Sequence, residues 1–475
     1  MNEIRATVDS MLRFPGAPKE VLSELRNSVT LSNPKWAMLK GAGKPVEHMD
    51  VPMSFNFAQE FPCLSLPRGA VRLATKRCKK LGYRIVWDDQ RVEGDDIVIP
   101  HRIPHGLRGF QDESNEKLIR FKQGTAIAGC GGGKTTIAMD AIWRVKKKTV
   151  VLVHTEDLLE QWLDELDAKL GIKAGIIKGA TFKPADVTIA MVKTLANKID
   201  TDQMKSFLAT VGFCIMDEAH HAPAETFMKA ISHIPAKHRL GVTATPKRAD
   251  GLGKAIFWGF GDELINVPTS ELLKMGFLML PKLEPVVTSF KYEPTSSDTY
   301  EKSHEIHRAL ARDDRRLHDI CSVMEHHAKQ GETCLILANN VDYCKRMGME
   351  MHKRGVSAVV CTGQLPKRVR RAALRDFRNG KSKFLIATSL ANEGLNVPSL
   401  SRIAFAWPES NEASTDQRTG RLMRLYDKEP VLIDFIDLGC EQLFNRYLRR
   451  ATVYRRLGME TPKPKDLKQC DLNAY

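Results

Sequence analysis

The residues with the clearest chemical potential lie in a glycine-rich stretch, AGCGGGKTT, at positions 128–136. Glycines leave backbone N–H groups free to turn toward a phosphate chain, which side chains at 131–133 would obstruct. A helix that begins directly after them adds the partial positive charge of its N-terminus. We expect Lys134 to neutralise the β and γ phosphates of ATP and the Thr135 hydroxyl to ligate Mg²⁺. The predicted ATP-binding residues here are Ala128, Gly129, Cys130, Gly131, Gly132, Gly133, Lys134, Thr135 and Thr136.

The second group of chemically active residues is the tetrapeptide DEAH, Asp217 to His220, which follows the apolar run FCIM. Such a run predicts a buried strand, and ligands bind at the carboxyl ends of strands in open α/β sheets. We expect Asp217 to hold Mg²⁺, directly or through water, and Glu218 to polarise the water that attacks the γ-phosphate. His220 and His221 have no partner at convincing metal-ligand spacing, so a coupling role for His220 is favoured over zinc binding. Together the two motifs predict hydrolysis of a nucleoside triphosphate.

The elements that must position these motifs are short apolar runs that alternate with helical patterns from about 125 to 265. This alternation is typical of a parallel sheet with helices on both faces. The expected strands are 124–128, 149–154, 187–192, 213–216 and 239–244, with a helix at 156–170. The alternation resumes with expected strands at 334–339, 357–363, 383–389, 402–407 and 430–436. The chain is therefore expected to contain two similar α/β units.

The segments around these units indicate the domain organisation. The stretch 281–302 carries three prolines and a Thr/Ser cluster, which is typical of a connector. About 100 residues of different character precede the first unit. We therefore predict an accessory domain at 1–104, a first lobe at 105–280, a connector at 281–302 and a second lobe at 303–475.

The chain is basic, with 72 Lys and Arg against 57 Asp and Glu and a formal net charge of +15. This excess favours nucleic acid as a partner before an acidic membrane surface, although a soluble basic enzyme can have the same composition. A helix through 69–81 spreads much of the charge around its surface and either contacts nucleic acid or is simply solvated. Its segment contains Arg68, Arg72, Lys76, Arg77, Lys79 and Lys80.

A second basic segment is PKRVRRAALRDFRNGKSKF, beginning at Pro366. A helix here could follow a phosphate backbone through side chains that include Arg368 and Arg371, each contact releasing counterions. The alternative is a solvated helix face.

The cysteines are scattered and never form a CxxC pair, which predicts buried, reduced thiols in an intracellular protein. The N-terminal sequence MNEIRATVDSMLRF lacks the apolar core of a signal peptide, and no run approaches 18 apolar residues. The expected location is the cytoplasm, or the host cytoplasm if the chain is phage-encoded.

The most informative stretch of the second unit is ASTDQRTGRLMRLYD, in which Arg418, Arg421 and Arg424 recur every three residues. On a helix they share a broad face, from which arginines could reach the γ-phosphate of a nucleotide held by the first unit. A solvated basic face is the alternative.

With these motifs in order, residues 105–440 resemble the superfamily 2 helicases, which have two RecA-like lobes. LRGFQ looks like the adenine-sensing motif, with Gln111 as the reader. VLVHTEDLLEQW looks like motif Ia and includes Thr155. IAMVKTL is similar to a segment that usually ends Gln-Ser-Leu, here with Lys193 and Thr194 at the last two polar positions. The resemblance implies that Thr155, Lys193 and Thr194 contact nucleic acid.

The later motifs extend the resemblance. GVTATPKRADG looks like motif III, which implies that Thr243 and Thr245 couple the nucleotide site to the strand. Its continuation, with Arg248 as a nucleic-acid contact, is similar to the XPB/UvsW-like branch, which often has Arg-Glu-Asp where this sequence has Arg-Ala-Asp. ATSLANEGLNVPSL is similar to motif V. QRTGRLMR resembles motif VI. The resemblance implies a backbone phosphate contact for Thr388, ribose contacts for Glu393 and Gly394, arginine fingers at Arg421 and Arg424, and coupling by Gln417 and Arg418.

The resemblance implies an α/β fold of two tandem RecA-like lobes with a small N-terminal α+β accessory domain. It also implies a DNA helicase or translocase that uses ATP and Mg²⁺ and acts on forks, branches or recombination intermediates. The expected partner is the DNA backbone, with little sequence specificity, alongside replication, recombination or defence proteins and no membrane. An RNA-dependent ATPase and a motor subunit of a restriction or defence complex are the alternatives.

Overall fold

The computed structural model of the chain describes residues 2–32, 54–56, 63–103, 106–220, 224–244, 253–388, 400–409, 412–423 and 428–467. The chain divides into two compact units, Met1–Pro268 and Thr269–Tyr475. Several residues singled out from the sequence lie outside the described residues. They are His221, Thr245, Arg248, Glu393, Gly394 and Arg424.

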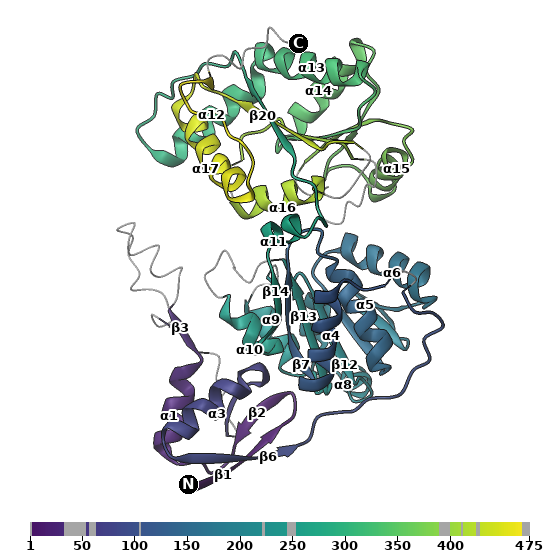
Figure 1. The fold of residues 1–475 in the computed structure, drawn as a ribbon, viewed down its shortest axis with the longest axis vertical. Coiled ribbons are helices and arrows are strands. Elements are labelled where there is room, and N and C mark those ends of the chain that lie inside the picture. The colour runs from purple at the N-terminus through teal and green to yellow at the C-terminus, as the bar shows by residue number, and fades with distance from the viewer. Residues whose placement is uncertain are drawn as a thin grey trace. The chain divides into compact units, whose positions relative to one another are not determined.

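The first unit begins with a small α+β domain on a four-stranded sheet in the order β5-β2-β1-β6 (Figure 1). β1 pairs parallel with β6 and antiparallel with β2, which pairs antiparallel with β5. Apolar side chains from the sheet and from two helices form one core, because each element buries one face. The elements are β1 (Asn2–Val8), β2 (Met11–Phe14), α1 (Lys19–Ser28), β5 (Leu64–Pro67), η1 (Arg68–Ala70), α3 (Val71–Lys80) and β6 (Tyr83–Asp89), with a separate pair of strands, β3 (Thr30–Ser32) and β4 (Ser54–Asn56).

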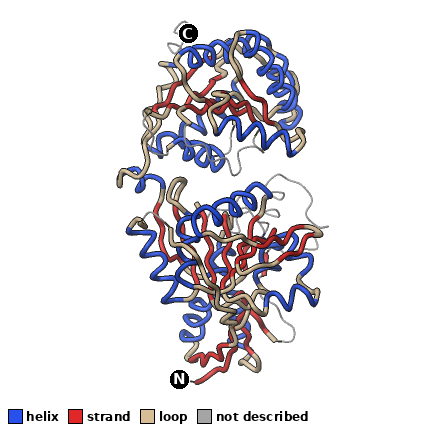
Figure 2. The backbone as a smooth tube through the Cα atoms, turned by 90° about the vertical axis from the view of Figure 1, so that its right-hand side faces the viewer, coloured by secondary structure: helices blue, strands red, loops and turns tan. Residues whose placement is uncertain are grey.

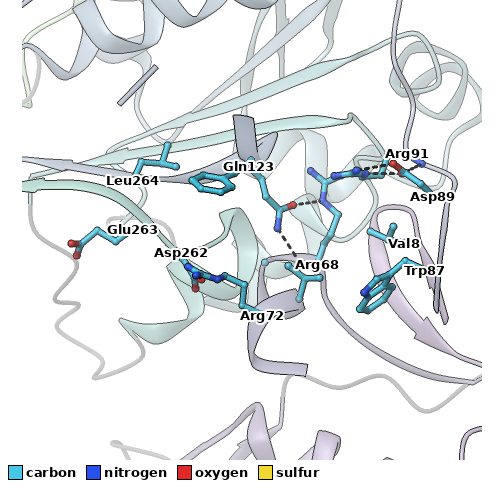
Figure 3. A pocket seen from close by; sticks show the side chains of 13 residues that line it. Val8, Arg68, Arg72, Trp87, Asp89, Arg91, Gln123, Asp262, Glu263 and Leu264 are labelled. Carbon is cyan, nitrogen blue, oxygen red and sulfur yellow. Dashed lines mark hydrogen bonds and ion pairs between the residues drawn. The ribbon is translucent and has the colours of Figure 1, made fainter. Parts of the chain in front are cut away.

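Two buried arginines fasten this domain to the rest of the first unit. The Arg68 guanidinium donates to Gln123 Oε1 at 2.9 Å (Figure 3). It also donates to the Ala236 carbonyl at 2.7 Å. Arg239 donates to the Ser10 carbonyl at 2.9 Å. A Cβ on Gly69 would lie 2.2 Å from the Phe257 carbonyl oxygen, so the backbones approach too closely for any larger residue.

These contacts change the interpretation of the basic segment around α3. Arg68 is 1% exposed and belongs to the interior, while Arg72 pairs with Asp262 and Arg77 pairs with Glu24, each at 3.0 Å. Arg68 therefore holds the domain to the rest of the first unit, since a buried guanidinium group must be hydrogen-bonded. The pairs of Arg72 and Arg77 are partly or largely exposed and contribute little. The lysines of α3 are exposed; they are Lys76, Lys79 and Lys80.

The rest of the first unit is an eight-stranded sheet in the order β10-β9-β11-β8-β12-β13-β7-β14. All neighbouring strands are parallel except β10, which is antiparallel to β9. Every residue of β8, β12 and β13 is buried, as expected for strands covered on both faces. The strands are β7 (Gln123–Ala128), β8 (Thr149–Val153), β9 (Gly175–Lys178), β10 (Thr181–Lys183), β11 (Val187–Met191), β12 (Phe213–Asp217), β13 (His238–Thr243) and β14 (Glu263–Val267).

Helices flank this sheet on both faces (Figure 2). The predicted helix at 156–170 is confirmed as α6, whose N-terminus is capped by Thr155 and whose C-terminus is followed by left-handed Gly171. The predicted strands of this region are confirmed as well. The helices are α4 (Gly109–Phe121), α5 (Lys134–Val145), α6 (Glu156–Leu170), α7 (Val192–Lys198), α8 (Asp202–Leu208), α9 (Ala224–Ile231) and α10 (Lys254–Phe260).

The second unit is a six-stranded, all-parallel sheet in the order β15-β20-β19-β16-β18-β17. Its strands are β15 (Lys282–Val287), β16 (Cys334–Leu337), β17 (Ala358–Cys361), β18 (Phe384–Ala387), β19 (Arg402–Phe405) and β20 (Val431–Ile436). Its helices are α11 (Thr269–Lys274), α12 (Thr299–Arg312), α13 (Asp314–Lys329), α14 (Val341–Lys353), α15 (Lys367–Arg378), α16 (Glu412–Leu422) and α17 (Glu441–Leu457). The five predicted strands of this unit are confirmed.

The segment 281–302, expected to be a connector, contains β15. This strand pairs along its whole length with β20, and it lies at the edge of the sheet. Proline has no backbone N–H to donate to a neighbouring strand, so within sheets it is found mainly on edge strands. The edge position of β15 therefore accommodates Pro285. The division between the units falls earlier, at Pro268–Thr269.

The described cysteines are all free thiols, and most are buried. In the same part of the chain, no helix combines the length and the apolar composition that a membrane crossing requires.

Candidate nucleotide site and nucleic-acid surfaces

The glycine-rich loop joins β7 to α5, so it leaves a buried strand at Ala128 and enters a helix at Lys134. Gly131 and Gly133 have φ values of +79° and +75°, which only glycine adopts readily. A Cβ on Gly133 would also lie 2.4 Å from Gln111 Nε2. The backbone conformation and the available space both require glycine at this position, which agrees with the predicted phosphate cradle.

Gln111 braces this loop from the first turn of α4. Its side-chain amide donates to the Gly132 carbonyl at 2.9 Å, and its Oε1 accepts from the Arg108 backbone N–H at 3.0 Å. The Arg108 guanidinium donates to the Gly131 carbonyl at 3.1 Å. Gln111 is 4% exposed, so these contacts fix its side chain. The contact of Gln111 with adenine stays a prediction. The structure shows in addition that Gln111 contacts the glycine-rich loop.

The charged residues of the two motifs meet at the carboxyl ends of β7 and β12. Lys134 Nζ lies 3.3 Å from Glu218 Oε1. Burial disfavours the charge on Lys134, but the carboxylates of Glu218 and Asp217 outweigh it and raise the pKa of Lys134. The amine is therefore firmly protonated and suited to neutralising phosphate oxygens.

Asp217 is held by a residue that the sequence interpretation did not single out. Trp162, on α6, donates from its indole Nε1 to Asp217 Oδ2 at 2.9 Å, and the Glu218 backbone N–H donates to Asp217 Oδ1 at 2.9 Å. Burial and the adjacent charge of Glu218 raise the pKa of Asp217, while Lys134 and the Trp162 N–H oppose that shift. Trp162 is therefore a positioning residue for this carboxylate.

Glu218 and His220 lie in a strained turn after β12. Glu218 has a φ of +47°, which is uncommon for a residue with a side chain and is found mainly where function requires it. His220 Nδ1 lies 2.8 Å from Thr243 Oγ1 and 3.5 Å from Glu218 Oε2. Thr243 ends β13 and is fully buried. His220 thus links the predicted water-activating residue to the predicted motif III.

The residues around the loop fit a magnesium nucleotide. The Thr135 hydroxyl and the Asp217 carboxylate are oxygen ligands of the kind Mg²⁺ prefers, and Thr135 lies in the first turn of α5. The left-handed glycines of the loop leave room for a phosphate chain beside Lys134. Bound there, the ion would neutralise charge that develops on the phosphate oxygens.

Comparison with known families matches each unit separately. The family described as "Type III restriction enzyme, res subunit" matches residues 105–248, and "Helicase conserved C-terminal domain" matches residues 315–426. The "Putative DNA 3'-5' helicase Rad25" of Halobacterium salinarum is 28% identical over 353 residues, which cover 72% of this chain and 56% of the relative. The chain belongs to the superfamily 2 helicases, in their XPB/UvsW-like branch.

The helicase is also similar to proteins whose names or structures involve RNA. The "Putative ATP-dependent RNA helicase L396" of Acanthamoeba polyphaga mimivirus is 25% identical over 348 residues, covering 70% of this chain and 64% of the relative. The helicase therefore spans less than two thirds of the length of both relatives. Among solved structures, S. cerevisiae Dbp5 bound to RNA and ADP BeF3 matches 77% of this chain and 98% of its own, with 15% identity and a TM-score of 0.55. That likeness concerns the fold, and the predicted pair of RecA-like lobes is confirmed.

The predicted motif VI of the helicase lies on α16. Arg418 is 8% exposed, and its guanidinium pairs with Glu409 at 3.0 Å. Burial lowers the pKa of Arg418, and Glu409 opposes that shift. Arg418 is thus engaged within the second unit, whereas Arg421 is partly exposed. The side chain of Gln417 lies outside the described residues.

The predicted strand contacts of the helicase have different surroundings. The Thr155 hydroxyl accepts the Leu158 N–H at 3.3 Å, and Thr194 Oγ1 accepts the Gly179 N–H at 3.0 Å. Lys193 is exposed, and Thr388 is 6% exposed directly after β18. The hydroxyl groups of Thr155 and Thr194 therefore already accept backbone hydrogen bonds within the first lobe. Their contact with nucleic acid stays a prediction.

The basic helix predicted in the second lobe is α15. Its exposed arginines are spaced by three and four residues, which places them on one face of the helix. They are Arg368, Arg371, Arg375 and Arg378. Ala373 and Phe377, on another side of the helix, are buried. The helix thus presents a basic stripe with the geometry expected for following a phosphate backbone.

Sequence reasoning missed Trp162 and Arg108. Trp162 reads as one more apolar residue in the periodic pattern of α6, and its partner Asp217 is 55 residues away. Arg108 lies within LRGFQ, where only Gln111 was given a role. Neither has a local signal, because each acts through a partner that only the fold brings close.

Proposed function

We propose that this helicase is an ATP-dependent DNA helicase or translocase acting on forked, branched or recombination-intermediate DNA. The observation that carries the hydrolytic part is the cluster of Lys134, Asp217 and Glu218 beside the glycine loop. Support for DNA comes from the 28% identity to a relative named as a DNA helicase. The basic composition also favours a polyanionic partner.

In the proposed mechanism, the loop N–H groups and Lys134 bind the phosphates of ATP, and Asp217 and Thr135 hold Mg²⁺. Glu218 accepts a proton from the attacking water, since its carboxylate lies beside Lys134 at the phosphate end of the site. Arg421 and Arg424 of the second lobe complete the charge clamp. Release of phosphate then shifts the lobes along the strand.

His220 transmits the state of the site in this mechanism. A change in the position of Glu218 alters the contact of His220 with Thr243, at the end of the strand that leads into motif III. The basic stripe of α15 and the residues Thr155, Lys193, Thr194, Arg248 and Thr388 hold the strand by its backbone. Contacts of this kind carry little sequence specificity. Such a motor works where its DNA is, in the cytoplasm of a bacterium or an infected host.

Two alternatives each have a specific observation in their favour. An RNA helicase is favoured by the similarity to the relative named as an RNA helicase. A motor subunit of a restriction or defence complex is favoured by the family matched to 105–248. The second alternative requires a partner protein with nuclease activity.

The test is ATP hydrolysis by the purified protein, alone and with single-stranded DNA, duplex DNA, forked DNA or single-stranded RNA. We expect the largest stimulation with forked DNA, and no hydrolysis by Lys134→Ala, which serves as the blank. Stimulation by RNA alone would overturn the assignment to DNA. A normal rate in Lys134→Ala would overturn the assignment of the site.

A further inference from the structure

A cavity of about 350 Å³ lies between α12 and α17 of the second lobe, outside every site described above. Its size is at the lower end of the range for ligand pockets. Three cations and several neutral polar groups line it, without a carboxylate. The lining side chains are Thr299, Lys302, Ser303, Ile306, Gln442, Asn445, Arg446 and Arg449.

The cations of this cavity lack carboxylate partners. Among the described residues, Lys302, Arg446 and Arg449 form no ion pair. Arg446 is only partly exposed and donates to neutral groups, His307 Nε2 at 2.7 Å and Ser303 Oγ at 3.2 Å. Burial lowers the pKa of Arg446; Cys440 and the Glu409 carboxylate oppose that shift, and the nearby Arg450 and Arg449 reinforce it. Glu409 offsets the cost of burial only in part, and a partly buried cation with too little negative charge nearby is stabilised by an anionic ligand.

The junction cavity in Figure 3 provides a contrast within the same protein. It measures about 400 Å³ and is also lined by arginines. There, however, Arg91 pairs with Asp89 at 2.7 Å and Arg72 pairs with Asp262 at 3.0 Å. The three arginines of that cavity are accompanied by three carboxylates, although Arg68 donates to neutral acceptors, whereas the cavity between α12 and α17 has three cations and no carboxylate in its lining.

The position of the cavity matches the ligand-binding side of the sheet. α17 begins shortly after β20 ends, and Arg446 also lies 3.5 Å from the carbonyl of Pro408, just beyond β19. The cavity is therefore at the carboxyl edge of the parallel strands, where ligands bind in open α/β sheets. The next residue, Glu409, pairs with Arg418 of the predicted motif VI. A ligand in the cavity would thus contact the segment that supports motif VI.

We propose that the cavity between α12 and α17 binds the phosphodiester backbone of the nucleic-acid strand, with Lys302 and Arg449 as phosphate contacts and Arg446 as the fixed cation between them. The inference rests on the proposed function and adds a contact on the β15–β20 side of the second sheet. α15, which carries the basic stripe, follows β17 at the other end of that sheet.

The test compares two double variants that remove equal charge. Lys302→Ala/Arg449→Ala empties the cavity of its outer cations and leaves Arg446 and its contacts intact. Lys329→Ala/Lys353→Ala is the control, because these lysines are exposed in the last turns of α13 and α14, before β16 and β17 begin. They therefore lie at the opposite edge of the sheet.

Binding of a fluorescein-labelled single strand and of a forked duplex is measured by anisotropy over a range of salt concentrations. We expect the cavity variant to bind on the order of tenfold more weakly, with a salt slope smaller by about one for each lost contact. The control should match the wild type. ATP hydrolysis without nucleic acid should be unchanged in both. Asn445→Glu, which adds a carboxylate to the cavity and removes no cation, should weaken binding in the same direction.

The outcomes separate the inference from the proposed function. If the wild type binds nucleic acid and neither the cavity variant nor Asn445→Glu binds it more weakly, the inference is overturned and the proposed function stands. Equal losses in the cavity variant and the control would also overturn it, because general charge would then account for the effect. A wild type that binds no nucleic acid would overturn both.

Discussion

Replacing Trp162 by phenylalanine is expected to weaken the binding of Mg²⁺ while an aromatic ring still fills the core beneath α6. Trp162 is 1% exposed, and its indole N–H donates to Asp217 Oδ2 at 2.9 Å. Phenylalanine keeps a ring but cannot donate. The change therefore removes the side-chain donor that orients the carboxylate proposed to hold the ion.

The size of the effect follows from the kind of bond. A hydrogen bond to a charged group contributes about 1.5–3 kcal/mol, and each 1.4 kcal/mol is a factor of about ten. Loss of a group that orients a metal ligand typically costs about 10- to 100-fold in affinity or activity. We therefore expect the Mg²⁺ concentration for half-maximal hydrolysis to rise at least about tenfold in Trp162→Phe.

The variant should also lose activity at a higher pH than the wild type. Burial and Glu218 already raise the pKa of Asp217, and the Trp162 N–H opposes this by stabilising the charged form. Without that donor the pKa rises further, so the carboxylate takes up a proton earlier as the pH falls. The acid limb of the pH profile should move toward neutral pH.

The assay titrates Mg²⁺ against ATP hydrolysis and, separately, against binding of a fluorescent ADP, with urea unfolding as a check on stability. Trp143→Phe is the matched control, since Trp143 lies on α5 and packs against Arg102 at 4.4 Å from the ring centre. Unchanged Mg²⁺ dependence in Trp162→Phe, or an equal change in Trp143→Phe, would refute the reasoning.

Two further predictions concern coupling and turnover. His220→Ala removes the link between Glu218 and Thr243, so the nucleic-acid-stimulated rate should fall more than the basal rate; equal loss of both rates would contradict a coupling role. Arg421→Ala should leave binding of fluorescent ADP unchanged and lower kcat by about 10³-fold or more, as expected for an arginine that acts only in the transition state. Weaker nucleotide binding in Arg421→Ala would instead indicate that this arginine supports the ground state.

The buried parts of the fold could be predicted from the sequence because they are locally encoded. β12 reads as an unbroken apolar run, and α6 carries its N-cap Thr155 and its terminal Gly171 in the sequence itself. β15 could not be predicted in this way. It is an edge strand with a proline, and the same composition is typical of a connector.

The residues of the candidate site also differ in whether the local sequence could predict their roles. The phosphate loop is a single continuous stretch, so its residue types and spacing predicted it directly. Trp162 and Arg68 are different, because each derives its role from partners far away in the sequence. Arg68 reads as one cation in a basic run, yet its guanidinium is buried against Gln123 and Ala236. Only the packing of the accessory domain on the first lobe distinguishes it from the exposed Lys76, Lys79 and Lys80.

The most direct test of the central claim is strand displacement from a forked DNA duplex by the purified protein. The release of a labelled strand is the quantity measured. We predict release that requires both ATP and Mg²⁺ and that is absent with Lys134→Ala. Hydrolysis of ATP on the fork without release would leave a translocase that does not unwind. Release by Lys134→Ala at the wild-type rate, or no response of the wild type to DNA, would contradict an ATP-driven DNA motor.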